Sequence, residues 1–325
     1  MTVNVLSRLD KQLLMGLQYE FPRTSSPIVD IAKKLGIEPN VALDRLKELN
    51  RLGVLKRIGF YVNYRSTGLK AALLAYQTNG KYDEIAEYYR RDKYATHVYL
   101  RDHPKYDLWI VTKRKTLEEL VQHAKTISKK YNIEGLVLYS RRTYKLSVKY
   151  DLENGISRSG PYSMIKTSPP HPTEFGVEPG YLKLLRKLEL SKTPYQKFAK
   201  AMGIGQDEAA SLAWKMLDAG ILGDPGAALD GHKIGFHENA MVVLEPLEGR
   251  EDELCKCASS LPFTTHVVLR ASIPQGAWKH TCYFMVHAVN RILLSNAIEQ
   301  AISQCPVKSH LVIRSLADLK PGVVR

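Results

Sequence analysis

The same six-residue pattern occurs twice in this chain, and such a repeat predicts a duplicated architecture. The segment Thr-His-Val-X-Leu-Arg stands at residues 96–101 and again at residues 265–270. In both places a stretch with helix-turn-helix spacing precedes the segment, and an aromatic-rich apolar stretch follows it. Because a histidine and an arginine persist while their surroundings diverge, the repeat indicates a pair of related sites.

The first part of each copy has the pattern of short helices followed by a wing. Leucines recur at helical spacing over residues 9–17, Pro27 stands at the first turn of a second helix, and Gly53 ends a third. We therefore expect a winged helix-turn-helix over residues 1–66. Residues 179–235 repeat the three-helix pattern and predict a second, helix-turn-helix-like domain.

Each copy continues with strand and helix patterns in the order β-α-β-β-α-β, which is typical of the ferredoxin-like arrangement. We expect ferredoxin-like domains over residues 67–150 and 236–325. Residues 151–178 are rich in Pro, Ser and Gly, a composition that predicts a linker. The fold class is thus α+β, with two halves that pair inside one chain as a pseudo-two-fold dimer. Further assembly into homo-oligomers stays open.

The net charge of +14 lies almost wholly in the first copy. Residues 1–150 hold 28 Lys and Arg against 15 Asp and Glu, a balance of +13, and the remainder holds 19 against 18, a balance of +1. A cationic field of this kind attracts polyanions, either nucleic acid or a small ligand that bears many carboxylates. A solvated surface of the kind found in thermophile proteins is the alternative explanation.

Two further features limit the setting of the protein. No apolar run reaches the roughly 18 residues of a membrane helix, and the N-terminus lacks a signal-peptide pattern. We therefore expect a cytoplasmic protein that does not enter a membrane. The four cysteines all fall in the second copy, and no second half of a zinc site accompanies Cys255-X-Cys257. We expect buried or spectator thiols at Cys255, Cys257, Cys282 and Cys305.

The third helix of each helix-turn-helix decides whether the chain can read DNA. A recognition helix needs an exposed face of Arg, Lys, Asn or Gln. The first copy offers Asn40, Asp44, Arg45, Lys47 and Arg51. The second copy offers Gln206, Asp207, Glu208, Ser211 and Lys215. Because a symmetric operator reader needs two competent arms, we expect no functional DNA binding, although residual binding by the first half stays open.

Several motifs of the first half form a set. They are Leu9-Asp10-Lys11-X-Leu13-Leu14, Glu20-Phe21-Pro22, Arg57-Ile58-Gly59, Asn63-Tyr64-Arg65, Leu69, Thr96-His97-Val98-Tyr99-Leu100-Arg101 and Tyr106-Asp107-Leu108-Trp109. This set resembles the N-terminal half of sirohaem decarboxylases, which share the fold of the Lrp/AsnC transcription regulators. The resemblance covers nearly the whole chain, in the order of a fused two-subunit enzyme, and implies Lrp/AsnC-type domains in tandem.

The second half resembles the partner subunit less closely. Residues 274–288, with Trp278-Lys279-His280 and Met285-Val286-His287, are similar to the tryptophan-to-histidine strand pair of that subunit. The second half departs from the family at Gly223-Asp224-Pro225-Gly226, where a basic Arg-Phe-Gly-like wing is usual. It departs again at His280, where an aromatic residue or asparagine is more usual.

The resemblance implies an enzyme, a carboxy-lyase that removes carbon dioxide from the two acetate side chains of sirohaem. The ligands would be sirohaem and 12,18-didecarboxysirohaem, an intermediate of haem d1 synthesis or of the alternative haem pathway. No cofactor is implied beyond the iron tetrapyrrole substrate, which carries its own electron sink. The sequence contains no nucleotide-binding glycine loop, metalloprotease motif or serine-nucleophile elbow.

The repeated segment supplies the candidate catalytic pair, His97 and His266. Decarboxylation leaves negative charge on carbon, which must then be protonated, and histidine titrates in the right range. Side chains four apart in a strand share a face, so each histidine can address the same ligand as Arg101 or Arg270. Alternatively, one histidine ligates the sirohaem iron while the other protonates. We expect no other metal site.

The remaining candidates would bind the substrate. Arg101 and Arg270 can form bidentate pairs with its carboxylates. Aromatic and histidine side chains suited to the macrocycle are Tyr99, Tyr106, Trp109, Trp278, His280, Tyr283 and His287. By strand alternation, His287 would share a face with Tyr283 and Met285. The cations at Arg141, Lys145 and Lys149 are weaker candidates, because an exposed strand edge explains them as well.

Two other functions compete with the enzyme. One is a transcription regulator of the Lrp/AsnC type, haem-responsive or not, that uses the basic first half on DNA. The other is a tetrapyrrole-binding sensor without turnover. The order of the two decarboxylations, the number of active clefts and the pathway of the product stay open.

Overall fold

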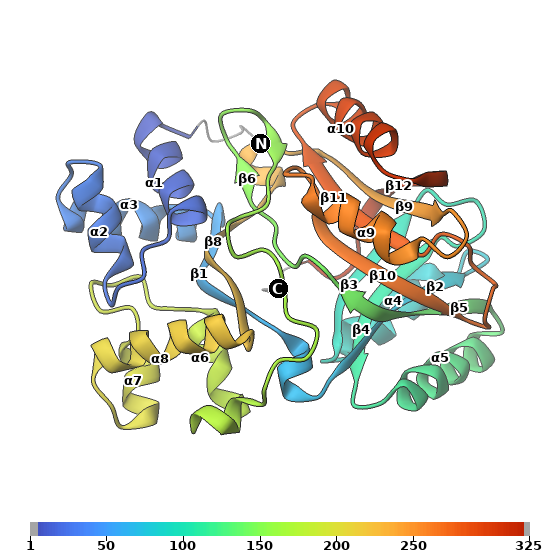
Figure 1. The fold of residues 1–325 in the computed structure, drawn as a ribbon, viewed down its shortest axis with the longest axis horizontal. Helices are drawn as coiled ribbons and strands as arrows, with labels where there is room; N and C mark the ends of the chain where they lie inside the picture. Colours follow the sequence, from blue (N-terminus) through green and yellow to red (C-terminus); the bar gives the residue numbers. More distant parts are fainter. Residues whose placement is uncertain (1–5, 322–325) are drawn as a thin grey trace. The chain divides into compact units, whose positions relative to one another are not determined.

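The computed structural model describes residues 6–321, which divide into two compact units (Figure 1). The first unit comprises residues 6–67, 145–238 and 287–294. The second comprises residues 68–144, 239–286 and 295–321. Each unit therefore takes segments from both copies of the repeat. Among the described residues, no helix combines the length and the apolar character needed to span a membrane.

The first unit contains both helix-turn-helix segments. The expected helices of the first copy are present, and Leu13, Leu14 and Leu17 are fully buried on one face of the first of them. The elements of the first copy are α1 (Arg8–Tyr19), α2 (Pro27–Lys34), α3 (Pro39–Arg51), β1 (Leu55–Val62) and the 3-10 turn η1 (Tyr64–Thr67). Those of the second copy are η3 (Pro179–Tyr181), α6 (Leu182–Arg186), α7 (Gln196–Met202), α8 (Gln206–Ala219), β8 (Leu222–Leu229) and η4 (His232–Ile234).

The two wings pair with each other as an antiparallel sheet of β1 and β8. Gly59 lies opposite Gly226 in this sheet, and both have positive φ angles, +147° and +138°. A Cβ at Gly59 would lie 2.5 Å from the carbonyl oxygens of Leu185 and Arg186, and one at Gly226 would lie 2.4 Å from that of Leu17. Because glycine has no side chain, each of these positions allows the first helix of the other copy to pack closely against the wing. The two copies are therefore in contact at both wings.

The segment expected to be a linker is built into the first unit. Residues 151–178 contribute to the short strands β6 (Tyr150–Asp151) and β7 (Ile156–Ser157) and contain η2 (Pro172–Phe175). Lys145 and Lys149 are each only 3% exposed, so the explanation of an exposed strand edge is wrong for both. The Lys149 ammonium lies 2.7 Å from Asp224 and also donates to the carbonyl oxygens of Gln18 and Pro225. Composition did not reveal this, because the partners come from distant segments.

The second unit contains both β-α-β-β-α-β repeats, as expected. The first comprises β2 (Lys70–Gln77), α4 (Tyr82–Arg91), β3 (Ala95–Arg101), β4 (Leu108–Arg114), α5 (Leu117–Tyr131) and β5 (Glu134–Thr143). The second comprises β9 (Glu238–Pro246), α9 (Glu251–Ser260), β10 (Thr265–Ile273), β11 (Cys282–Ala288), α10 (Arg291–Gln304) and β12 (Val307–Asp318). A few terminal residues of β9, β11 and α10 belong to the first unit.

The strands of the two repeats form one sheet that closes on itself. Their order is β10-β5-β2-β4-β3-β12-β9-β11, and β10 pairs in addition with β11. The seams between the copies are β3 with β12 and β5 with β10, both antiparallel. The inner face is an apolar cluster drawn from both copies: Leu73, Ala75, Tyr106, Trp109, Leu136, Leu138, Met241, Val243, Tyr283 and Ile313. The expected pairing of the two halves is therefore present, as a shared core.

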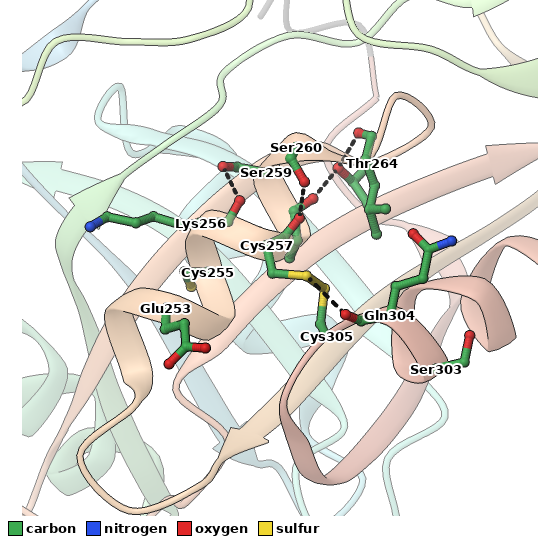
Figure 2. Close-up of a disulfide and its surroundings, with 12 residues drawn as sticks. Glu253, Cys255, Lys256, Cys257, Ser259, Ser260, Thr264, Ser303, Gln304 and Cys305 are labelled. Atoms are coloured by element: carbon green, nitrogen blue, oxygen red, sulfur yellow. Dashed lines mark hydrogen bonds between the residues drawn. A yellow bond between two sulfur atoms is a disulfide. The ribbon is translucent and has the colours of Figure 1, made fainter.

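All four cysteines form disulfides, so the expectation of spectator thiols is wrong. Cys255 is bonded to Cys282 on β11, and Cys257 is bonded to Cys305 at the end of α10. Figure 2 shows the Cys257–Cys305 bond, with Cys255 on the same helix. Cys255 and Cys257 are two residues apart on α9, so their side chains point in different directions and meet different partners. The sequence did not predict these bonds because the partners come from other elements.

The disulfides stand where the equivalent helix of the first copy uses large side chains. Helix α4 buries Ile85 and Tyr89 against the sheet, and the Tyr89 hydroxyl lies 2.9 Å from that of Tyr76. Helix α9 buries only one large apolar residue, Leu254, together with Cys255, Ala258 and Ser259. Two covalent links thus compensate for a smaller apolar contact area.

We expect the double substitution Cys257→Ser and Cys305→Ser to lower the free energy of unfolding by about 3 kcal/mol, because an open chain gains entropy when it unfolds. Guanidinium denaturation measures this change. The reduced wild-type chain is the matched control and should lose at least as much, because both bonds are then open. Equal stability of the oxidised wild type and the variant would contradict the role given to this link.

We expect Asp224→Ala to lower the free energy of unfolding by about 3–5 kcal/mol, because it leaves the buried Lys149 ammonium without its carboxylate. The control is Asp218→Ala, which breaks the exposed ion pair with Arg23 and should cost about 0–1 kcal/mol. If urea denaturation gave the same loss of unfolding free energy for both substitutions, the buried pair would stabilise the fold no more than the exposed one.

Candidate active site

The repeated segment of the first copy forms β3 and places three candidate residues on the inner face of the closed sheet. His97 lies opposite Val111 in β4, and Tyr99 lies opposite Trp109. Because directly opposed residues of antiparallel strands project to the same side, both side chains point toward the inner apolar cluster. The guanidinium of Arg101 lies 4.9 Å from the centre of the Tyr99 ring. His97 and Arg101 therefore share a face, as their spacing predicts.

Arg101 is a buried cation at a seam between the two copies. It is 5% exposed, and its Nη1 donates to the carbonyl oxygen of Ile313 in β12 at 3.3 Å. Burial lowers its pKa to about 10, so the guanidinium remains charged near neutral pH. Its Nε is buried and has no hydrogen-bond partner within the described part of the chain. Such a group is suited to a carboxylate, which would satisfy the remaining donors.

Arg270 repeats this arrangement at the other seam. Its Nη1 donates to the carbonyl oxygen of Leu138 and to the hydroxyl of Ser140 in β5, both at 3.0 Å. Its guanidinium lies 5.3 Å from the centre of the Tyr283 ring. Arg270 is paired with Ser140 in the ladder, as Arg101 is with Ser315. Each copy thus sends its repeated arginine onto the last strand of the other copy.

His266 is held differently from His97. Its φ angle is +51°, in the left-handed region that non-glycine residues seldom adopt, and the ladder between β10 and β11 shifts between Thr265 and Val268. A shift of this kind inserts an extra residue and interrupts the alternation of side chains. Spacing alone therefore does not place His266 on the face of Arg270. In the first copy, the Thr96 hydroxyl lies 2.9 Å from Nδ1 of His97.

Three of the candidate aromatic residues, Tyr106, Trp109 and Trp278, pack into one cluster that joins the two copies. The Trp278 ring lies 6.0 Å from that of Tyr106 and 5.9 Å from that of Trp109. The indole N–H of Trp109 donates to the carbonyl oxygen of Tyr106 at 2.7 Å. Burial raises the pKa of Tyr283 above its ordinary value, so this phenol stays protonated near neutral pH.

His287 belongs to the first unit. Its ring lies 5.7 Å from the ring of Tyr150, and its backbone N–H donates to the Ser157 hydroxyl at 3.0 Å. These contacts account for the residue as part of the packing around β6 and β7. The face that strand alternation suggests for His287, shared with Tyr283, stays a prediction.

Sequence reasoning overlooked His103, in the turn between β3 and β4. Its ring stacks on that of Tyr106 at 5.6 Å and lies 5.5 Å from that of Trp278. The signal was its position two residues after the repeated arginine, in the turn Asp102-His103-Pro104. Residues in a turn are usually expected to face solvent. Here Trp278, from the hairpin of the second copy, packs against His103.

The cations of the recognition helix α3 form ion pairs with carboxylates of the same copy. Arg45 binds the buried carboxylate of Asp10 through two hydrogen bonds, the longer at 2.9 Å. Arg51 lies 2.6 Å from Glu48, and Lys47 lies 3.5 Å from a carboxylate one turn away. These pairs leave fewer cations for phosphates or base edges than the sequence of α3 suggests.

The chain belongs to the family with the AsnC-like ligand binding domain, whose model matches residues 66–145 and 233–320, more than half of the sequence. A second model, described as the siroheme decarboxylase NirDL-like HTH domain, matches residues 10–55. The duplication seen in the repeated segment is therefore a duplication of this ligand-binding domain. Among the residues that the structure covers, no cluster of three or more His, Cys, Asp or Glu is placed to hold a metal ion.

Similar proteins match over nearly their whole length. A siroheme decarboxylase NirDL subunit of Paracoccus pantotrophus is 24% identical over 298 residues, 90% of this chain and 89% of that protein. A siroheme decarboxylase of Hydrogenobacter thermophilus is 22% identical over 85% of this chain and 82% of its own. The crystal structure of a siroheme decarboxylase NirDL covers 97% of this chain and 92% of its own, with a TM-score of 0.64 and 19% identity. A second structure of a siroheme decarboxylase NirDL, with an iron-uroporphyrin III analogue, has a TM-score of 0.63. The structural likeness extends the shared fold to both units.

Proposed function

We propose that this chain is a sirohaem decarboxylase, a carbon–carbon lyase that converts sirohaem to 12,18-didecarboxysirohaem. The observation that carries the proposal is the pair of seam arginines, Arg101 and Arg270, each stacked on a tyrosine ring. The match of the whole chain to proteins named siroheme decarboxylase supports it. A substrate with many carboxylates around a flat ring fits paired cations set among aromatic side chains.

The reaction needs no oxidant. In each step the bond between an acetate methylene and its carboxylate breaks, and the electron pair passes into the conjugated macrocycle. Carbon dioxide leaves, and the methylene carbon takes up a proton to become a methyl group. The macrocycle supplies the electron sink, and the protein must orient the acetate and deliver the proton.

We assign proton delivery to His97 in the first copy and to His266 in the second. His97 lies on the face of β3 that carries Tyr99 and Arg101, so a ligand held by the arginine lies on the same side as the imidazole. Arg101 and Arg270 would bind carboxylates, with Tyr99, Tyr106, Trp109, Trp278 and Tyr283 as apolar surface. The two acetates and the two copies allow one proton donor for each step.

The helix-turn-helix copies support this function better than a role in gene regulation. Helix α3 directs its cations into ion pairs with Asp10, Asp44 and Glu48. Helix α8 begins with Asp207 and Glu208, which would face phosphates with negative charge. The two wings pair with each other. We infer that these domains serve as a structural base rather than as a reader of DNA.

We expect anaerobic incubation of sirohaem with the purified chain to lower the mass of the tetrapyrrole by two molecules of carbon dioxide. Mass spectrometry of the extracted pigment measures this loss. A pigment that keeps its mass while the chain binds it would contradict turnover and leave a tetrapyrrole sensor.

We expect His97→Ala to lower kcat by about 10²-fold or more, because it removes a positioned general acid. Arg101→Lys should instead raise the substrate Kd by about 10-fold, because it loses the planar fork that matches a carboxylate. Steady-state kinetics separates the two effects. The control is His171→Ala, at a partly exposed residue of the first unit, which should change neither. Negligible effects of both site variants would remove β3 from the active site.

We expect duplex DNA to bind the chain only weakly and without sequence preference. Any binding should fall steeply with added salt, because it rests on the net charge alone. Competition of random against promoter duplexes in a gel-shift assay measures the preference. Retention of one promoter fragment at physiological salt, with random DNA in excess, would favour a regulator.

A further inference from the structure

The two β hairpins of the second unit bring two imidazoles to the same tryptophan. We call His103, Trp278 and His280 the hairpin cluster. His103 comes from the turn between β3 and β4, and the other two precede β11. The Trp278 ring lies 5.5 Å from each imidazole ring. All three side chains are partly exposed, so a ligand can reach them from solvent.

The hydrogen bonds of His103 make it a donor. Its Nδ1 accepts the backbone N–H of Tyr106 at 2.9 Å and that of Lys105 at 3.2 Å. Nδ1 must therefore carry the lone pair, and in the neutral ring the proton lies on Nε2. Burial lowers the pKa of His103, which favours the neutral ring. Toward a ligand, His103 thus presents an N–H group and no lone pair.

The hydrogen bonds of His280 give it the opposite polarity. The Ser309 hydroxyl donates to Oε2 of Glu245 at 2.5 Å, so its hydrogen is already committed. The same oxygen lies 3.2 Å from Nε2 of His280 and must accept from an N–H there. The bond from Ser309, together with Lys308, lowers the pKa of Glu245 and keeps it an ionised acceptor. The lone pair of His280 therefore lies on Nδ1.

Nothing in residues 6–321 occupies that lone pair. The hydrogen bond of His280 is made through Nε2, and Nδ1 does not belong to the buried polar atoms that lack a partner. Nδ1 is thus open to solvent. Burial of the ring lowers its pKa and favours the neutral imidazole. A neutral imidazole whose second nitrogen donates toward a carboxylate is the usual state of a metal-ligating histidine.

We propose that His280 binds the iron of the tetrapyrrole substrate through Nδ1 and that Ser309 and Glu245 act as positioning residues. The inference rests on the proposed function, since the iron arrives with the substrate. Trp278 offers an indole beside the ligating ring, and His103 can donate its Nε2–H to a peripheral carboxylate. Trp109 and Tyr283 hold equivalent places in the two copies, and both lie on the inner face. Tyr106 stands three residues before Trp109, as His280 does before Tyr283. The first copy therefore has a tyrosine where the second has the proposed ligand. The site is therefore asymmetric.

The test uses iron(III) uroporphyrin III and metal-free uroporphyrin III as probes on the full chain. We expect the wild-type iron complex to show the visible and electron paramagnetic resonance spectra of imidazole ligation. His280→Ala should lose that signature, keep its affinity for the metal-free ring, and regain the signature when free imidazole is added. Ser309→Ala should weaken ligation by about 10-fold or more, because the ring loses its second-sphere partner. His280→Gln provides a second variant that keeps a polar side chain.

Two further variants separate this role from general disturbance. His103→Ala removes the proposed donor to a peripheral carboxylate, so it should weaken binding of both probes alike and keep the ligation spectrum of the bound iron complex. The control is His310→Ala, which removes an exposed imidazole on β12 and should change neither binding nor the spectrum. A wild-type spectrum in His280→Ala, or its loss in His97→Ala or His266→Ala instead, would overturn the proposal.

The failure of this inference is distinguishable from failure of the proposed function. If the wild type removes carbon dioxide from sirohaem and His280→Ala keeps the ligated spectrum, only the ligand assignment is wrong. If the wild type binds neither probe and leaves sirohaem unchanged, the function and the ligand assignment are both wrong.

Discussion

The second unit depends on the two seams at which β3 pairs with β12 and β5 pairs with β10. A four-stranded ferredoxin-like sheet alone would leave edge strands with unpaired backbone groups and one apolar face in water. Pairing across the seams satisfies those edges, and the inner cluster buries the two faces against each other. The repeated arginines lie at these seams, so the contact that completes the fold also positions the charged groups of the candidate site.

Duplication gives the two halves the same fold, and divergence gives them different side chains around the candidate site. Arg101 and Arg270 keep equivalent partners on the last strand of the opposite copy. Around them, the first copy has Tyr99 and Tyr106 where the second has Val268 and His280. The second copy also closes α9 with disulfides, whereas the first packs α4 through Tyr89. Under the proposed function, two unequal halves would present different side chains to the two acetates of one substrate.

Local patterns in the sequence predicted the elements well, because helix and strand periodicity depend on neighbouring residues. Both β-α-β-β-α-β repeats and the helices of the first copy follow from spacing alone. The face shared by His97 and Arg101 follows in the same way. Long-range features did not. The partners of Cys257 and Lys149, the ladder shift at His266 and the packing of His103 all depend on segments far away in the chain.

A crystal structure of the chain with bound iron uroporphyrin tests most directly whether both copies build one substrate site in the second unit. We predict that Arg101 and Arg270 contact carboxylates of the same ring, and that aromatic side chains from both hairpins lie against it. A ring held by one copy alone, or bound only by residues of the first unit, would contradict the site described for this protein.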